Sequence, residues 1–283
     1  MQSAEAIRDA NVRYHDLAAE HYDSKWGINY GEVGQAQVHG KLKKALGHEP
    51  RRYGRALEIG AGTGYFTLNL LRAGVVGRAV ATDISPGMLR KLEATARELE
   101  LEVETAACEA ADLPFEDGAF DVVVSVFGII FAPDAERALA EVVRALRPGG
   151  RALVSVWIPE GAIRDMVEVL ARGVVAAGGP ERPQFGWHDP EAVAPVAARL
   201  GASVTAEDGA LVIEGASPEA YFAAGEATHP MSVAMQPLLD RTGRYPELRE
   251  AAIAALREGN EDPAAFRVTT PYRVYRLTRR PAA

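Results

Sequence analysis

Short apolar runs alternate with amphipathic segments between residues 55 and 157. Because these runs are apolar almost throughout, helices are expected to cover both faces of the sheet that the runs form. The alternation predicts βαβ units and a doubly wound α/β fold with a parallel sheet. The five runs predicted as strands are Ala56–Ile59, Ala79–Thr82, Leu101–Thr105, Asp121–Phe127 and Ala152–Trp157.

Capping residues predict where several helices begin and end. Ser85 and Pro86 are typical of the N-cap and first position of a helix, which we expect to run to about Leu99. Asp134 is expected to cap another helix, which the Pro-Gly-Gly sequence at 148–150 is expected to end. In the first 50 residues we predict two helices, the second with three apolar residues on one face and a glycine stop: Val38, Leu42, Leu46 and Gly47.

The pattern changes after Trp157. We predict helices over 162–177, 191–200, 218–225, 233–241 and 246–258, and strands over 203–213 and 267–278. This order predicts four parts: an N-terminal helical cover (1–50), an α/β domain (51–214), a helical cap insertion (215–265) and the last strand of the α/β domain (266–283).

The composition is that of an ordinary globular protein, with 48% hydrophobic and 25% charged residues in a chain of 283. A net charge of −8 argues against nucleic acid or an anionic membrane as partner. The single cysteine, Cys108, excludes an intrachain disulfide, and the N-terminus lacks the apolar region of a signal peptide, so we expect a cytoplasmic protein. No H-x-x-x-H or H-E-x-x-H spacing occurs, and no metal site is predicted.

A glycine-rich turn follows the first predicted strand, with Gly60, Gly62 and Gly64 two residues apart. Glycines at this spacing let a ligand approach the backbone, where a Cβ would intrude. The dinucleotide fingerprint G-x-G-x-x-G would place its third glycine at Tyr65, so the match fails. Two acidic residues accompany the turn: Glu58 precedes it, and Asp83 ends the second strand. A carboxylate at the second position can accept hydrogen bonds from both hydroxyls of a ribose, which predicts an adenosine ligand.

In this order and spacing, five segments resemble the class I S-adenosylmethionine-dependent methyltransferases, specifically the small-molecule group that includes the ubiquinone and menaquinone C-methyltransferases. The resemblance spans about residues 54–157, and the segments are 57–64, 81–89, 109–115, 120–121 and 146–150. It implies a Rossmann-like methyltransferase fold, in which a mostly parallel seven-stranded sheet has an antiparallel last strand and the helical cap. It also implies S-adenosylmethionine as cofactor.

The resemblance further implies roles for individual residues. The methionine part of the cofactor would be surrounded by Gly60, Ala61, Gly62 and Gly64, with Glu58 near its ammonium group. Asp83 would bind the ribose. Adenine would lie between Ile84 and Met88, and Glu109 would bind its amino group beside the Ala110 backbone. The family more often has Asp or Asn at position 109, so Asp112 is an alternative to Glu109. Tyr22 would contact the cofactor from the N-terminal cover, and Val126 and Phe127 would face the reacting methyl group.

The methyl acceptor is expected to be a small hydrophobic or aromatic metabolite. Seven aromatic residues fall in segments expected to border the cofactor cleft: Tyr22, Trp26, Phe127, Phe131, Trp157, Phe185 and Trp187. Nucleobase and amide methyltransferases have an Asn/Asp-Pro-Pro-aromatic sequence after the fourth strand, whereas this chain has Phe-Gly-Ile-Ile at 127–130.

Methyl transfer to oxygen, carbon or nitrogen is therefore the leading hypothesis for the function. The alternatives are a cofactor-binding protein that does not methylate, such as a cyclase or a binding module, and a nicotinamide-dependent oxidoreductase, which the failed fingerprint disfavours. Of the six histidines, His21 and His229 are the best placed to act as a base. We assign neither as catalytic.

Overall fold

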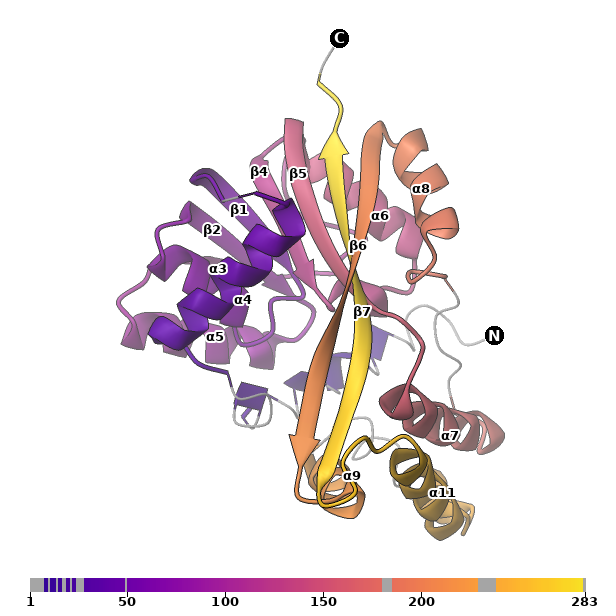
Figure 1. Ribbon diagram of the computed structural model, residues 1–283. Coiled ribbons are helices and arrows are strands. Elements are labelled where there is room, and N and C mark those ends of the chain that lie inside the picture. The colour runs from indigo at the N-terminus through magenta and orange to yellow at the C-terminus, as the bar shows by residue number, and fades with distance from the viewer. Residues whose placement is uncertain are drawn as a thin grey trace.

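Seven strands form one twisted sheet in the computed structural model, with the order β3-β2-β1-β4-β5-β7-β6 (Figure 1). The model describes residues 8–9, 11–13, 15–16, 19–20, 22–23, 28–48, 50–179, 185–228 and 238–281. The first five strands are parallel to one another, and β7 is antiparallel to both β5 and β6. The predicted mostly parallel sheet with an antiparallel last strand is confirmed. The strands are β1 (Tyr53–Ile59), β2 (Val76–Asp83), β3 (Glu104–Ala107), β4 (Phe120–Val126), β5 (Leu146–Trp157), β6 (Ala202–Gly215) and β7 (Phe266–Arg279).

Helices cover both faces of the parallel half of this sheet (Figure 1). On one face, Val38 and Leu42 of α3 pack with Val122 and Val124 of β4. On the other face, α6 and α8 pack against alternate strand residues such as Val123. The helices with the 3-10 turn η1 are α3 (Glu32–Leu46), α4 (Tyr65–Arg72), α5 (Pro86–Glu98), η1 (Ile129–Phe131), α6 (Ala135–Ala145), α7 (Ala162–Ala176), α8 (Pro190–Arg199), α9 (Pro218–Thr228) and α11 (Tyr245–Glu258).

The predicted helix caps are confirmed at three positions. Ser85 Oγ accepts a hydrogen bond from the Met88 N–H at the start of α5, and Asp134 accepts one from the Arg137 N–H at the start of α6. Gly47 ends α3 in the left-handed conformation with φ 73°. The capping residues therefore set the ends of the helices that flank the sheet.

Four of the predicted strands begin three or more residues from the expected position: the first two begin three residues earlier, at Tyr53 and Val76, and the third and fifth differ for local reasons. The third strand begins at Glu104 and not at Leu101, because the Leu101 N–H donates to Ala96 O and continues the turn that ends α5. The fifth strand begins at Leu146, directly after α6, because Leu146 already pairs with Phe120 across a register shift in β4. The Pro-Gly-Gly sequence therefore lies inside β5 and does not end the helix.

The last two strands extend beyond the rest of the sheet as a two-stranded ribbon (Figure 1). β6 pairs with β7 along 14 residues of each strand, whereas β5 pairs only with residues 272–278 of β7. The free end of this ribbon packs with α7, α9 and α11 around a separate apolar cluster that includes Phe222, Ile253, Leu256, Phe266 and Val268. We call α7, α9, α11 and this end of the ribbon the cap.

The predicted division of the chain at residues 214 and 215 stays a prediction. The predicted division follows the order of the chain. In the structure, however, α7 packs with α11 of the insertion, although α7 lies before that boundary. Most of the helix predicted over 233–241 lies outside the described residues. Among the helices that the structure describes, none is both long and apolar enough to cross a membrane.

Candidate functional site

The glycine turn after β1 has a backbone that only glycine adopts readily. Gly60, Gly62 and Gly64 have φ angles of 69°, 55° and 91°. A Cβ at Gly60 would lie 2.6 Å from the Cα atom of Gly128, so the turn after β1 contacts the backbone that follows β4. Among the described residues, a Cβ at Gly62 would meet only the Tyr22 ring, at 3.8 Å. The turn is thus tightly packed on the side of β4 and has room for a ligand at Gly62.

Glu58 is a buried carboxylate directly beneath this turn. Only 4% of the residue is exposed, and its Oε2 accepts hydrogen bonds from the backbone N–H and the hydroxyl of Thr67 in α4. Burial raises the pKa of Glu58 to about 8, although the hydrogen bonds from Thr67 oppose this shift. The carboxyl group is therefore largely protonated at neutral pH in the ligand-free protein, and a nearby cation would favour its ionised form.

Asp83 ends β2 beside the turn, and its carboxylate joins two loops. Oδ2 accepts a hydrogen bond from the Gly62 N–H (2.9 Å), and Oδ1 accepts one from the Ser85 N–H (2.9 Å). Burial raises the pKa of Asp83, and the nearby His15 opposes this shift. These bonds hold the carboxylate at the carboxyl ends of adjacent parallel strands, where α/β sheets bind ligands.

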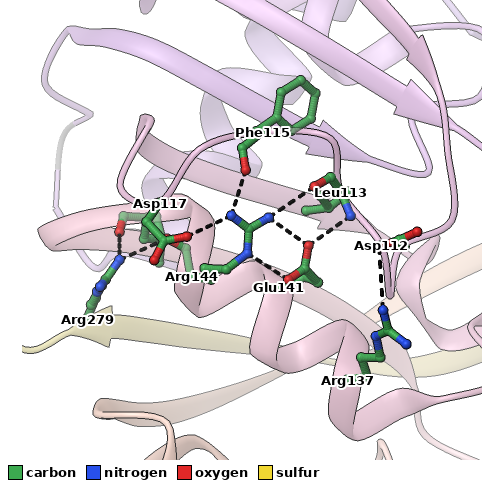
Figure 2. A network of polar contacts seen from close by, with 9 residues as sticks. Asp112, Leu113, Phe115, Asp117, Arg137, Glu141, Arg144 and Arg279 are labelled. Carbon is green, nitrogen blue, oxygen red and sulfur yellow. Dashed lines mark hydrogen bonds and ion pairs between the residues drawn. The ribbon is translucent and has the colours of Figure 1, made fainter.

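The two candidates for binding adenine lie in different surroundings. Glu109 Oε2 is buried and has no hydrogen-bond partner among the described residues, and burial raises the pKa of Glu109. The side chain of Asp112 is 83% exposed and lies 3.5 Å from Arg137 on α6 (Figure 2). A buried acceptor without a partner is costly unless a ligand supplies a donor. The geometry therefore favours Glu109 over Asp112.

A network centred on Arg144 of α6 holds the loop that follows Glu109 (Figure 2). Arg144 donates to the Leu113 and Phe115 carbonyls and to the carboxylates of Asp117 and Glu141, and Glu141 accepts the Leu113 N–H (2.8 Å). The hydrogen bonds to Glu141 and Asp117 raise the pKa of Arg144, which stays charged. The loop is thereby tied to α6, and Glu109 lies between this anchored loop and β3.

The remaining predicted adenosine contacts lie around the β2–α5 turn. Ile84 directly follows Asp83 and is partly buried, and the Ala61 N–H donates to Thr82 O (2.9 Å). Met88 is fully buried and packs with Ala19 and Tyr22 of the N-terminal segment. Burial raises the pKa of Tyr22 to about 12. The structure thus brings Tyr22 and Met88 together beside Gly62.

Sequence reasoning missed two residues of the N-terminal segment. His15 packs edge-on against Phe131, with ring centroids 5.7 Å apart, and lies close enough to Asp83 for their charges to interact. Asp16 Oδ1 accepts hydrogen bonds from the Gly87 N–H (2.8 Å) and the Ser85 hydroxyl. The only signal in the sequence is Gly87 at the start of α5, which leaves room for Asp16. The other suggested bases, His21 and His229, lie outside the described residues.

An aromatic stack lies at the carboxyl ends of β4 and β5. Phe127 has a positive φ of 58°, which is rare for a residue with a side chain. Its ring stacks on Trp157, with centroids 3.9 Å apart, and meets Tyr272 of β7 edge-on at 5.9 Å. Val126 instead packs with the α3-side cluster. Strained backbone at a strand end beside a ligand-binding turn is typical of a functional position.

The other aromatic residues differ in their placement. Phe185 and Trp187 contact each other edge-on, at 4.9 Å, and pack in the core on the α6 side. The expectation that they border the cleft is not supported by this packing. Trp26 lies outside the described residues. The stack of Phe127, Trp157 and Tyr272 is joined to the glycine turn through Gly128, which follows Phe127 and contacts Gly60.

These features match the class of protein expected from the sequence. The sheet order, the glycine turn and Asp83 define a class I methyltransferase fold. Residues 57–154 match the family model described as a methyltransferase domain. The match covers the turn, Asp83, Glu109 and Phe127, and it ends before the cap.

Curated relatives agree with this assignment over the same part of the chain. An uncharacterised protein of Mycobacterium bovis is 33% identical over 141 residues, which are 49% of this chain and 51% of the relative. The demethylmenaquinone methyltransferase of Thermus thermophilus is 39% identical over 105 residues, 37% of this chain and 48% of the relative. The chain thus spans about half the length of these relatives. The resemblance to quinone C-methyltransferases is confirmed.

A solved structure shows the same fold over the whole chain. Phosphoethanolamine N-methyltransferase 2 of Haemonchus contortus, in complex with phosphomonomethylethanolamine and S-adenosylhomocysteine, is 17% identical with a TM-score of 0.61. The similarity covers 100% of this chain and 61% of that one. At this identity it establishes the fold.

Proposed function

We propose that the chain binds S-adenosylmethionine at the glycine turn and transfers its methyl group to a small hydrophobic or aromatic metabolite. One observation supports this above all: three glycines with positive φ and the buried, hydrogen-bonded Asp83 meet at the carboxyl ends of β1 and β2. The site also has features that fit this cofactor, namely the room at Gly62 and the partnerless Oε2 of Glu109.

In this proposal each residue binds a stated part of the cofactor. The backbone from Gly60 to Gly64 surrounds the methionine part, and the Glu58 carboxyl group lies near its ammonium. Asp83 accepts hydrogen bonds from the ribose hydroxyls, Ile84 and Met88 contact adenine, and Glu109 accepts from the adenine amino group beside the Ala110 backbone. Tyr22 covers the turn, and Val126 and Phe127 lie at the end next to the reacting group.

The acceptor would lie against the stack of Phe127, Trp157 and Tyr272. Large aromatic faces favour an apolar or aromatic molecule, since small-molecule sites combine apolar walls with few polar groups. The relative from Thermus thermophilus is named for a demethylmenaquinone substrate, which is an aromatic compound. We therefore propose an acceptor of this chemical class, methylated at oxygen, carbon or nitrogen.

The cofactor supplies a methyl group already activated on a sulfonium, so the protein mainly aligns the acceptor and excludes water. Such alignment can contribute on the order of 7–11 kcal/mol to the lowering of a barrier. The close approach of Gly60 to Gly128 and the stacking of the Phe127 ring on Trp157 are suited to this task, because both restrict movement at this end of the site. No catalytic base is assigned.

Calorimetric titration with S-adenosylmethionine tests the cofactor assignment. We expect micromolar-range binding to the wild type and at least a 100-fold loss of affinity in Asp83→Ala, because two charge-assisted hydrogen bonds to the ribose would be lost. Glu104→Ala is the matched control: this carboxylate lies on the neighbouring β3, is 61% exposed and pairs with Arg55. Its removal should leave the affinity unchanged.

The outcomes separate the proposal from its alternatives. Equal affinities of the wild type and Asp83→Ala would contradict the site assignment. Binding of NADH without binding of S-adenosylmethionine would favour an oxidoreductase. Mass spectrometry of products from aromatic acceptors tests the reaction itself: turnover without the mass gain of one methylene would favour a cyclase.

A further inference from the structure

The carboxylate of Asp16, in the N-terminal segment, binds the β2–α5 turn, which holds Asp83, Ile84 and Met88. We propose that Asp16 is a positioning residue for the cofactor: it fixes this turn and holds the N-terminal segment over the adenosine site. The inference rests on the proposed function, because it concerns the affinity of the same cofactor site. Asp16 lies far from this turn in the sequence and in none of the segments that resemble a family motif.

Asp16 completes a continuous chain of hydrogen bonds from the glycine turn to α5. The Gly62 and Ser85 N–H groups donate to the two oxygens of Asp83. The Ser85 hydroxyl accepts from the Met88 N–H (3.1 Å) and donates to Asp16 Oδ1. Asp16 Oδ1 also accepts from the Gly87 N–H (2.8 Å). Because the Ser85 proton is directed at Asp16, Ser85 keeps a lone pair for Met88, and the carboxylate lies where a helix N-terminus favours negative charge.

Gly87 is matched to Asp16. A Cβ at position 87 would lie 2.7 Å from Asp16 Oδ1 and 3.2 Å from Asp16 Cα. Gly87 is not among the residues with positive φ, so its backbone does not require glycine. Glycine is otherwise unfavourable at a helical position. The contact with Asp16 is therefore the reason that the structure offers for this glycine.

The other contacts of the N-terminal segment end at the same site. Ala19 and Tyr22 pack on Met88, and the Tyr22 ring lies beside Gly62. On the opposite side, Asn11 Nδ2 donates to Phe131 O (3.0 Å) in η1. The segment thus lies across the site from η1 to α5, and Asp16 supplies the hydrogen bonds that fix its position on α5. Loss of these bonds should weaken cofactor binding without removing any group that touches the cofactor.

Calorimetric titration of variants with S-adenosylmethionine tests the proposal. We expect Asp16→Ala to raise the Kd about tenfold, since it removes two hydrogen bonds to a charged acceptor. Asp16→Asn keeps an oxygen acceptor and should bind within about threefold of the wild type. Gly87→Ala should also raise the Kd several-fold, because its Cβ would displace Asp16, while its thermal midpoint should fall less than that of Asp16→Ala, because alanine favours the helix. A raised Kd without a matching loss of thermal stability is not expected if Asp16 only stabilises the fold.

Asp189→Ala is the matched control. Asp189 caps α8 in the same way, by accepting the Glu191 N–H (2.9 Å), but on the α6 side of the sheet away from the turn. Its loss should lower the thermal midpoint about as much as Asp16→Ala does and leave the Kd unchanged. Wild-type affinity, or a higher affinity, in both Asp16→Ala and Gly87→Ala would overturn the inference. Failure of the wild type to bind the cofactor would instead contradict the proposed function.

Discussion

Two carboxylates, Glu58 and Asp83, are buried beside the glycine turn, whereas the charged groups of the cap lie at its surface. In the described parts of α7, α9 and α11 no polar side chain is buried, and pairs such as Arg257 with Glu219 are about half exposed. Burying a charge is costly, and such groups are concentrated where proteins bind ligands. Buried ionisable groups, which are typical of ligand sites, therefore lie at the sheet edge and not in the described helices of the cap.

The part of the chain that matches the family model also excludes the helices of the cap. The family match ends at residue 154, before α7 begins the cap. Under the proposed function, the part with buried carboxylates performs the cofactor chemistry common to the family. The cap, together with the aromatic stack, would then account for differences in acceptor.

The largest effect on the free energy of unfolding is expected for a substitution at Gly60 in the glycine turn. Gly60→Ala should lower the free energy of unfolding by about 4 kcal/mol, because it combines a left-handed backbone with a contact to Gly128 Cα. Gly149→Ala is the control: φ is 73° there, but no atom lies within 4 Å of the added Cβ. It should cost only about 1 kcal/mol. Denaturant unfolding measures both, and equal losses would show that packing against Gly128 is unimportant.

The next prediction compares a buried leucine in the cap with a buried leucine beneath the glycine turn. Leu256 of the cap and Leu68 beneath the glycine turn are both fully buried. Replacement of either by alanine should cost about 3 kcal/mol of stability. We expect the cofactor Kd of Leu256→Ala to stay within about twofold of the wild type. The Kd of Leu68→Ala should rise, because Leu68 packs with Ala61 of the glycine turn. A weaker cofactor affinity in Leu256→Ala alone would contradict the separation of the two regions.

A smaller effect is expected from pH, through Glu58. The folded pKa of about 8 lies above the ordinary value of 4.5, so the folded state holds the proton more tightly than the unfolded state. The stability contribution of the protonated group is fully present below pH 4.5 and is lost as pH rises to about 8. Between about pH 5.5 and pH 7 the wild type should lose on the order of 2 kcal/mol more than Glu58→Gln does. Parallel urea titrations check this, and identical pH profiles would show that Glu58 is not shifted.

The smallest effect distinguishes the two adenine candidates. Glu109→Gln should raise the cofactor Kd about tenfold, because an amide is a weaker acceptor than a carboxylate and presents an NH₂ group toward the adenine amine. Asp112→Asn should change it less than twofold, since Asp112 is exposed and paired with Arg137. The reverse order of effects would assign adenine to Asp112.

Local rules predicted much of this arrangement from the sequence. Gly60, Gly62 and Gly64 were predicted as a turn and have positive φ, and Ser85 and Asp134 cap the helices expected of them. These features depend on neighbours within a few residues. The mostly parallel seven-stranded sheet with an antiparallel last strand followed from the resemblance, whereas the strand order was not predicted.

Other features depend on contacts between distant residues and could not be predicted. Asp16 and Gly87 are 71 positions apart, and neither residue alone indicates the contact. The choice between Glu109 and Asp112 depends on which side chain the loop turns inward, which Arg144 of α6 determines. The packing of α7 with α11 likewise joins elements on either side of β6, and hydrophobic periodicity does not identify the partner of a helix.

A crystal structure of the protein with S-adenosylhomocysteine tests the central claim most directly. The account predicts the ribose hydroxyls on the Asp83 carboxylate, the adenine amine at Glu109, the amino acid part along Gly60–Gly64 and the sulfur facing Phe127. Binding elsewhere, or a ribose that does not contact Asp83, would contradict it.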